Sequence, residues 1–214
     1  MKETAANCIA YLEWRMSVHD RASNYVVMAE GYFLAVIRLI ESLMQEDGRH
    51  DADAVIYPML FNLHQGIELY LKGTSIALDQ IKQEGSQWEV DIKKTHDLEL
   101  LIDCLNEHVT AIGCKDLLER NESTAPLYDA VDLCKWVGDD RRGSYYVDFA
   151  RYPEQLRKSK PTVIEHAFVL ADDCMTVNLN GLLTIVRECF DFLDGYYSQF
   201  ADQLERLKAR AQTC

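Results

Sequence analysis

Apolar residues recur along this chain at spacings of three and four, over stretches long enough for several helical turns. Such spacing places the side chains on one face of an α-helix. Between residues 54 and 83 the pattern continues for about seven turns, through Ile56, Leu60, Leu63, Ile67, Leu71, Thr74, Leu78 and Ile81. This segment is predicted to be the central core helix, and Gly85 and Ser86 are predicted to end it.

Other segments show the same period. They predict helices over residues 24–46, 96–113, 125–137 and about 172–210, with a shorter helix around 8–16. In the first of these, the expected core stripe is Val26, Phe33, Ile37, Ile40 and Met44. Thr95 or Asp97 is predicted to cap the helix at 96–113, because a side-chain oxygen there accepts a hydrogen bond from a backbone amide of the first turn. Residues 48–53 are expected to form a turn, and 139–161 one long, ordered, irregular loop that has room for a short extended piece. The chain is therefore predicted to be all-α and a single domain, 1–214.

The last predicted helix carries the longest apolar seam. The seam consists of Met175, Leu179, Leu182, Val186, Cys189, Leu193, Tyr196, Phe200, Leu204 and Leu207. A helix of this length is about 55 Å long, which exceeds the width of a compact domain. Either Gly181 or Gly195 breaks it, or it reaches a second subunit.

Net charge restricts the partners of the chain. The formal charge is −13, which repels nucleic acid at long range. Between Arg141 and Lys160, however, six basic residues accompany only two acids. Any phosphate contact is therefore expected in this segment.

Composition favours a folded protein of the cytosol. Apolar residues make up 48% and charged residues 27%, as in ordinary globular chains. The first residues lack the apolar run of a secretory signal, and no run of 18 apolar residues predicts a membrane span. The 7 cysteines show no CxxC pair and are interpreted as reduced thiols in the core.

Two helical motifs and a later turn resemble the HEPN superfamily. The run YPMLFNLHQGIELYLKG (57–73), followed by THDLELLI (95–102), is similar to the central helix pair of that family, with its E-x-x-LK and H-D-L elements. FARYP (149–153) resembles the F-R-Y-P turn of many bacterial members, with one residue inserted. The resemblance covers about 24–205 and implies an up-and-down helical bundle.

The resemblance also implies a function, although one element of it is absent. Many HEPN proteins are metal-independent ribonucleases that use R-x(4–6)-H in the last helix, generally as homodimers. There arginine stabilises the phosphorane charge and histidine moves the proton of the attacking 2′-hydroxyl. In this sequence no arginine has a histidine at that spacing. The nearest equivalent by location is Arg187, which has Phe192, Leu193 and Asp194 where the histidine would stand.

Polar residues in the central helix pair are candidates for a site. His64, Glu68 and Lys72 lie at i, i+4 and i+8, on one ridge. They either line a polar site or form a salt-bridge ladder at the surface or half-buried. His96 and Asp97 are either a metal-binding His-Asp pair or residues that cap and pack the start of a helix. The cap is favoured because no pattern of further metal ligands accompanies them.

The basic segment supplies the other candidates, which are Arg141, Arg142, Arg151 and Tyr152. Arginine can form two bonds to a phosphate, and tyrosine can stack on a base. The alternative is a loop that Arg151 pins to the acidic bundle, with Tyr152 buried.

These observations favour a noncatalytic HEPN-like protein that acts as a homodimer and binds a partner protein, nucleic acid or nucleotide. The resemblance suggests a bacterial toxin–antitoxin or defence context, with a nucleotidyltransferase as one kind of partner. The alternative is a ribonuclease with a rearranged site built from Arg187 with Asp194 or His166. A third hypothesis is a nucleotide-binding regulator. No cofactor or metal is expected.

Overall fold

The computed structural model describes residues 16, 20–45, 49–82, 95–134, 136–138, 159–161, 168–171 and 174–212. Most of these residues are helical. The elements are α1 (Arg21–Gln45), α2 (Arg49–Lys82), α4 (Leu98–Ala111), the short 3-10 helix η1 (Glu122–Thr124), α5 (Ala125–Cys134) and α7 (Leu179–Gln212). The predicted short helix around 8–16 lies outside the described residues, apart from Met16.

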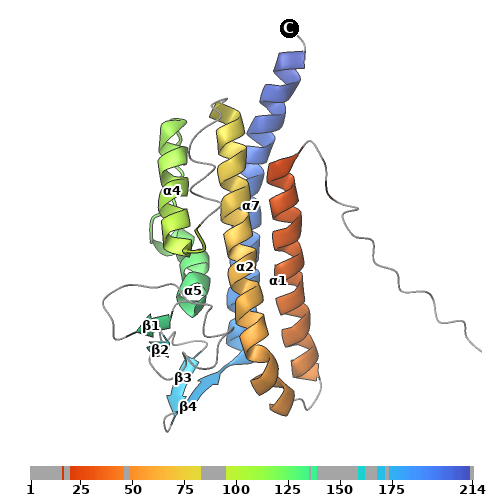
Figure 1. The fold of residues 1–214 in the computed structure, drawn as a ribbon, viewed down its shortest axis with the longest axis vertical. Helices are drawn as coiled ribbons and strands as arrows, with labels where there is room; N and C mark the ends of the chain where they lie inside the picture. The colour runs from red at the N-terminus through yellow and green to blue at the C-terminus, as the bar shows by residue number, and fades with distance from the viewer. Residues whose placement is uncertain are drawn as a thin grey trace, which may run out of the picture.

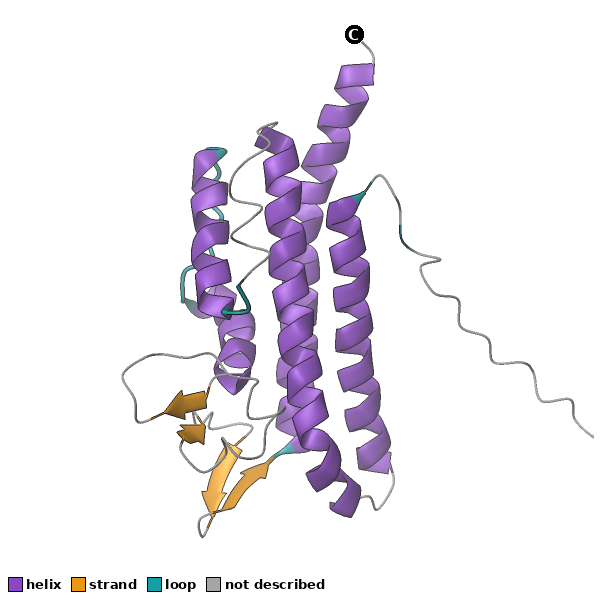
Figure 2. Ribbon diagram, viewed as in Figure 1, coloured by secondary structure: helices purple, strands orange, loops and turns teal. Residues whose placement is uncertain are grey.

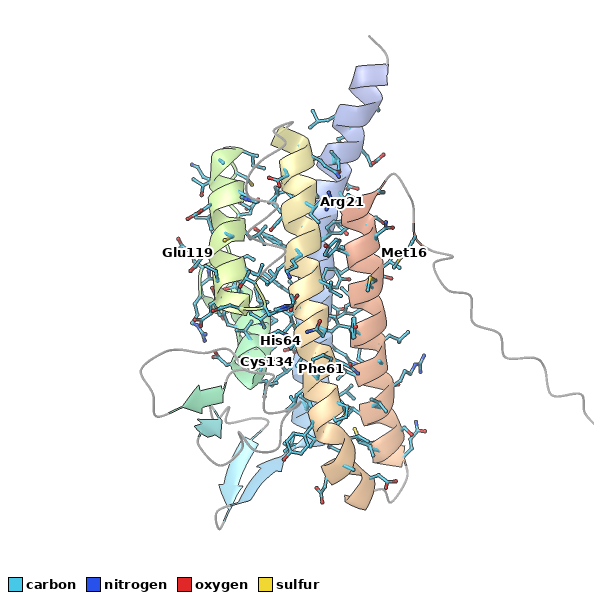
Figure 3. The ribbon with its side chains drawn as sticks, in the orientation of Figure 1. Met16, Arg21, Phe61, His64, Glu119 and Cys134 are labelled. Carbon is cyan, nitrogen blue, oxygen red and sulfur yellow. The ribbon has the colours of Figure 1, made fainter. Side chains whose placement is uncertain are left out.

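The helices form a bundle around α2. Helix α1 runs antiparallel to α2 along one side, α7 runs alongside both, and α4 and α5 pack on the other side of α2 (Figure 1). Side chains fill the spaces between the ribbons (Figure 3). The all-α prediction is confirmed. None of the helices in the described ranges has an apolar stretch sufficient to cross a membrane.

Short strands accompany the helices at one end of the bundle (Figure 2). Strand β1 (Trp136–Gly138) pairs antiparallel with β2 (Ser159–Pro161), with Val137 opposite Lys160. Strand β3 (Phe168–Ala171) pairs antiparallel with β4 (Cys174–Val177), with Leu170 opposite Met175. These are two-stranded ribbons beside a helical core, so they do not alter the fold class.

The core consists of the predicted helical stripes. On α1 the buried residues are Ala22, Val26, Ala29, Phe33, Val36 and Ile40. Two residues predicted to belong to this stripe are not fully buried: Ile37 is half-buried, and Met44 is 44% exposed near the end of the helix. Helix α2 is most enclosed over its middle and second half, since no residue from 59 to 80 is exposed.

Several predicted helix boundaries were wrong, and α1 begins at Arg21 rather than at residue 24. Helix α7 begins at Leu179 rather than near 172, because residues 174–177 are paired in β4 and Asn178 caps the helix by accepting from the Asn180 amide at 3.1 Å. Helix α5 ends at Cys134 rather than 137, where β1 follows. The predicted turn at 48–53 is helical from Arg49 onward, in α2.

The apolar seam of α7 is used within the chain. Neither Gly181 nor Gly195 breaks the helix, contrary to one of the two expectations. From Leu182 to Leu204 the seam residues are buried in this single chain, against α2, α5 and α1. The end of α7 extends past the other helices in Figure 1. The length of the seam therefore does not by itself require a second subunit.

Helices α1 and α2 approach closely at two glycines of α2. A Cβ on Gly66 would lie 2.8 Å from the Phe33 ring, and one on Gly73 would lie 3.2 Å from the Ala22 carbonyl oxygen. The Phe33 ring also packs 5.2 Å from Phe190 and 5.9 Å from Tyr70, measured between ring centroids. The absence of a side chain at Gly66 thus makes room for an aromatic cluster shared by α1, α2 and α7.

Candidate functional site

A buried carboxylate, Glu68, is the centre of a polar cluster between α2 and the start of α4. Its Oε1 atom accepts a hydrogen bond from Lys72 Nζ at 2.7 Å. His96 Nδ1 lies 3.0 Å from Oε2 and 3.1 Å from Oε1, and His64 Nδ1 lies 3.8 Å from Oε2. We call His64, Glu68, Lys72 and His96 the polar cluster. All four had been candidates for a site in the sequence, and the structure brings them together around Glu68.

Burial distinguishes the polar cluster from a surface salt-bridge ladder. The side chains of Glu68 and Lys72 are 4% and 5% exposed, whereas that of His96 is 70% exposed. The sequence had left open whether this ridge lies at the surface, half-buried or in a site. The ridge therefore lies inside the bundle, where the Lys72 ammonium and the Glu68 carboxylate pair with each other.

Local backbone geometry holds His96 over Glu68. Asp97 caps α4, since its Oδ1 accepts from the Leu100 amide at 3.0 Å. Thr95 Oγ1 accepts from the Asp97 amide at 3.1 Å, which adds a second local bond to the segment. The cap predicted at Asp97 is confirmed, and His96 bonds a carboxylate of α2. Within the part of the chain that the structure describes, no three His, Cys, Asp or Glu side chains are grouped to hold a metal ion.

The hydrogen bond to Glu68 determines what the His96 imidazole can do. With Glu68 ionised, Nδ1 is the nitrogen that carries the proton, because a carboxylate only accepts. In the neutral ring, Nε2 is then the acceptor, on an imidazole that is largely exposed to solvent. The arrangement is an oriented, solvent-facing proton acceptor.

Two of the residues proposed for a rearranged nuclease site, Arg187 and Asp194, each form a hydrogen bond with another helix. Arg187 Nη2 donates to Glu41 Oε1 of α1 at 2.5 Å. Asp194 Oδ1 accepts from the Tyr70 hydroxyl of α2 at 3.2 Å. Both contacts link α7 to another helix, and no local sequence signal predicted either one, since the partners are 146 and 124 residues apart.

Five candidates lie outside the described residues. They are His166 and the four residues of the basic segment, Arg141, Arg142, Arg151 and Tyr152. Of the stretch predicted as an irregular loop, the structure describes only Ser159–Pro161, which is strand β2.

Burial raises the pKa of several tyrosines in the bundle. The pKa of Tyr70 is raised by burial first and then by the negative charges of Asp194 and Glu30. Burial likewise raises the pKa of Tyr196, and it raises that of Tyr197 to about 12. The folded state therefore holds these protons more tightly than the unfolded state, in which tyrosine titrates near ~10.

Stability is accordingly expected to fall as pH rises above about 10, because unfolding then releases protons. Below that pH the contribution of these tyrosines is fully present. Urea unfolding followed by circular dichroism, at a series of pH values from about 7 to about 11, measures the loss. In Tyr70→Phe, which lacks one titrating group, the loss should be shallower. An equal slope in the two proteins would contradict the assignment for Tyr70.

Comparison with models of protein families, with curated proteins and with solved structures found no match to this chain. The resemblance to HEPN proteins therefore rests on the motifs in the sequence.

Proposed function

We propose that this chain is a noncatalytic HEPN-like protein that acts by association, as a homodimer that binds a partner protein, nucleic acid or nucleotide. The observation that carries this proposal is the ion pair between Arg187 and Glu41. An arginine whose charge is matched by a carboxylate of its own chain is poorly suited to stabilise a phosphorane. Asp194 is likewise engaged, by the Tyr70 hydroxyl.

The partner-binding half of the proposal depends on charge in the sequence. The basic residues between Arg141 and Lys160 give this segment a positive charge in a chain whose net charge is −13. Such a segment can bind a phosphate or an acidic surface of a partner. The toxin–antitoxin or defence context and a nucleotidyltransferase partner are parts of the proposal that come from the family resemblance.

One observation favours an enzyme as the second candidate. The His96 imidazole is exposed and oriented by the buried Glu68 carboxylate, which is the arrangement of a general base. In that case His96, on the segment before α4, would replace the histidine that the last helix lacks. The two candidates differ in a simple assay.

We expect total RNA to stay intact when incubated with the purified protein in a buffer that contains a chelator. The rate of cleavage, followed on a denaturing gel, should equal that of buffer alone. Cleavage that is lost in Arg187→Ala would contradict the proposal and favour the rearranged nuclease site. Cleavage that persists in Arg187→Ala but is lost in His96→Gln would instead assign the activity to the polar cluster.

A further inference from the structure

The outward side of α1 is uncharged where a surface helix is normally polar. Opposite the buried stripe lie Asn24, Val27, Met28, Gly31, Leu34 and Ala35, which we call the outer strip. Two of its members are large apolar residues in water, with Leu34 53% and Met28 43% exposed. An apolar strip on an otherwise acidic protein indicates a contact surface.

Gly31, in the middle of the outer strip, is not explained by packing against the described part of the chain. A glycine inside a helix costs about 1 kcal/mol relative to alanine. Gly66 and Gly73 offset that cost by allowing α1 and α2 to approach, whereas a Cβ on Gly31 would meet nothing within 4 Å. A glycine at an exposed, central position suits the close approach of another backbone.

Opposite charges lie at the two ends of the outer strip. Asp20, which accepts from the Ser23 amide at 3.0 Å, precedes the strip, and Arg38 follows it. They are separated by about five turns and so lie on the same side of the helix. The Arg38 side chain is 74% exposed. In an antiparallel pair of α1 helices centred on Gly31, each Arg38 would lie about one turn from the Asp20 of the other copy, so opposite charges lie near each other at both ends of the contact.

The apolar side chains of the strip fit the same arrangement. With a two-fold axis at Gly31, residues equally far from it on opposite sides meet across the contact. Met28 of one copy then faces Leu34 of the other, and Val27 faces Ala35. The two large exposed apolar side chains therefore meet each other and leave water together.

We infer that the outer strip of α1 binds the outer strip of a second copy, antiparallel across Gly31. This inference rests on the proposed homodimer and moves its interface from α7 to α1. The strip offers on the order of 400 Å² per copy, taking α1 as ~37 Å long and ~10 Å wide, about half of a standard interface. The dimer is therefore weak and dissociates on dilution.

Sedimentation velocity of the full chain over a concentration series tests this inference. Leu34→Glu should weaken the dimer by about 100-fold or more, because symmetry places two carboxylates in an apolar contact. The matched control is Leu100→Glu on α4, where the leucine is 48% exposed and makes no part of the strip. This control should dimerise as the unmodified chain does.

A second variant separates loss of the dimer from loss of the fold. Gly31→Gln adds a good helix former and blocks the approach of two backbones, so it should weaken the dimer while Tm, measured on dilute protein, stays equal or rises. A dimer that tolerates both Leu34→Glu and Gly31→Gln would overturn the α1 interface but leave the proposed homodimer standing.

A strict monomer at every concentration would overturn both the interface and the homodimer. A monomer whose Tm falls sharply in Leu34→Glu would show in addition that another part of the same chain covers the strip.

Discussion

Replacing Glu68 with alanine is expected to lower the free energy of unfolding by about 3–5 kcal/mol. The change leaves the Lys72 ammonium buried, at 5% side-chain exposure, without its carboxylate. It also removes the acceptor that holds His96 before the first turn of α4. Urea unfolding near neutral pH, followed by circular dichroism, measures the loss.

Two further variants show whether the loss comes from the unpaired charge. Glu107→Ala removes an exposed carboxylate from α4 and should change stability by less than about 0.5 kcal/mol. The double variant Glu68→Leu with Lys72→Met replaces both charges by apolar groups and should recover most of the stability. If the double variant were as unstable as Glu68→Ala, the cost would lie in packing rather than in the uncompensated ammonium.

Gly66→Val is expected to cost about 3 kcal/mol, because its Cβ would enter the Phe33 ring. That ring is fully buried against Tyr70 and Phe190, and protein interiors are close-packed. The free energy of unfolding is again measured in urea. Gly31→Ala, at a glycine whose Cβ meets nothing, should instead add up to about 1 kcal/mol in dilute protein.

A double-mutant cycle with Phe33→Leu tests the cause of the Gly66 effect. A smaller side chain at 33 gives room to the valine, so the double variant should be more stable than the sum of the single changes predicts. Additive effects would mean that Phe33 is not what Gly66 accommodates.

His96 has a different role in each of the two candidate functions. In an association protein, His96 only completes the bonding of Glu68, and its exposed ring carries no chemistry. In the enzyme alternative the same ring accepts a proton from a substrate. The fold effect of Glu68→Ala is common to both, so the RNA assay, not stability, decides between them.

The presence of the main helices could be predicted from the sequence, because the spacing of apolar residues and the capping residues are features of neighbouring positions in the chain. The cap at Asp97 and the core stripe of α2 were predicted from neighbouring residues alone. Strands β1 and β4 were missed, since their residues continue the apolar pattern of the adjacent helices. Only pairing with β2 and β3 makes those residues extended.

The candidate site shows the same division. Spacing placed His64, Glu68 and Lys72 on one ridge of a helix, and the cap motif placed His96 at the start of another. Whether that ridge faces water depends on which helices surround α2, and the sequence of one helix does not specify which helices pack against it. The ion pair between Arg187 and Glu41 joins residues 146 positions apart. Periodicity thus indicates where the helices lie and which of their sides are apolar, whereas exact ends, burial and long-range pairing arise only when the chain packs.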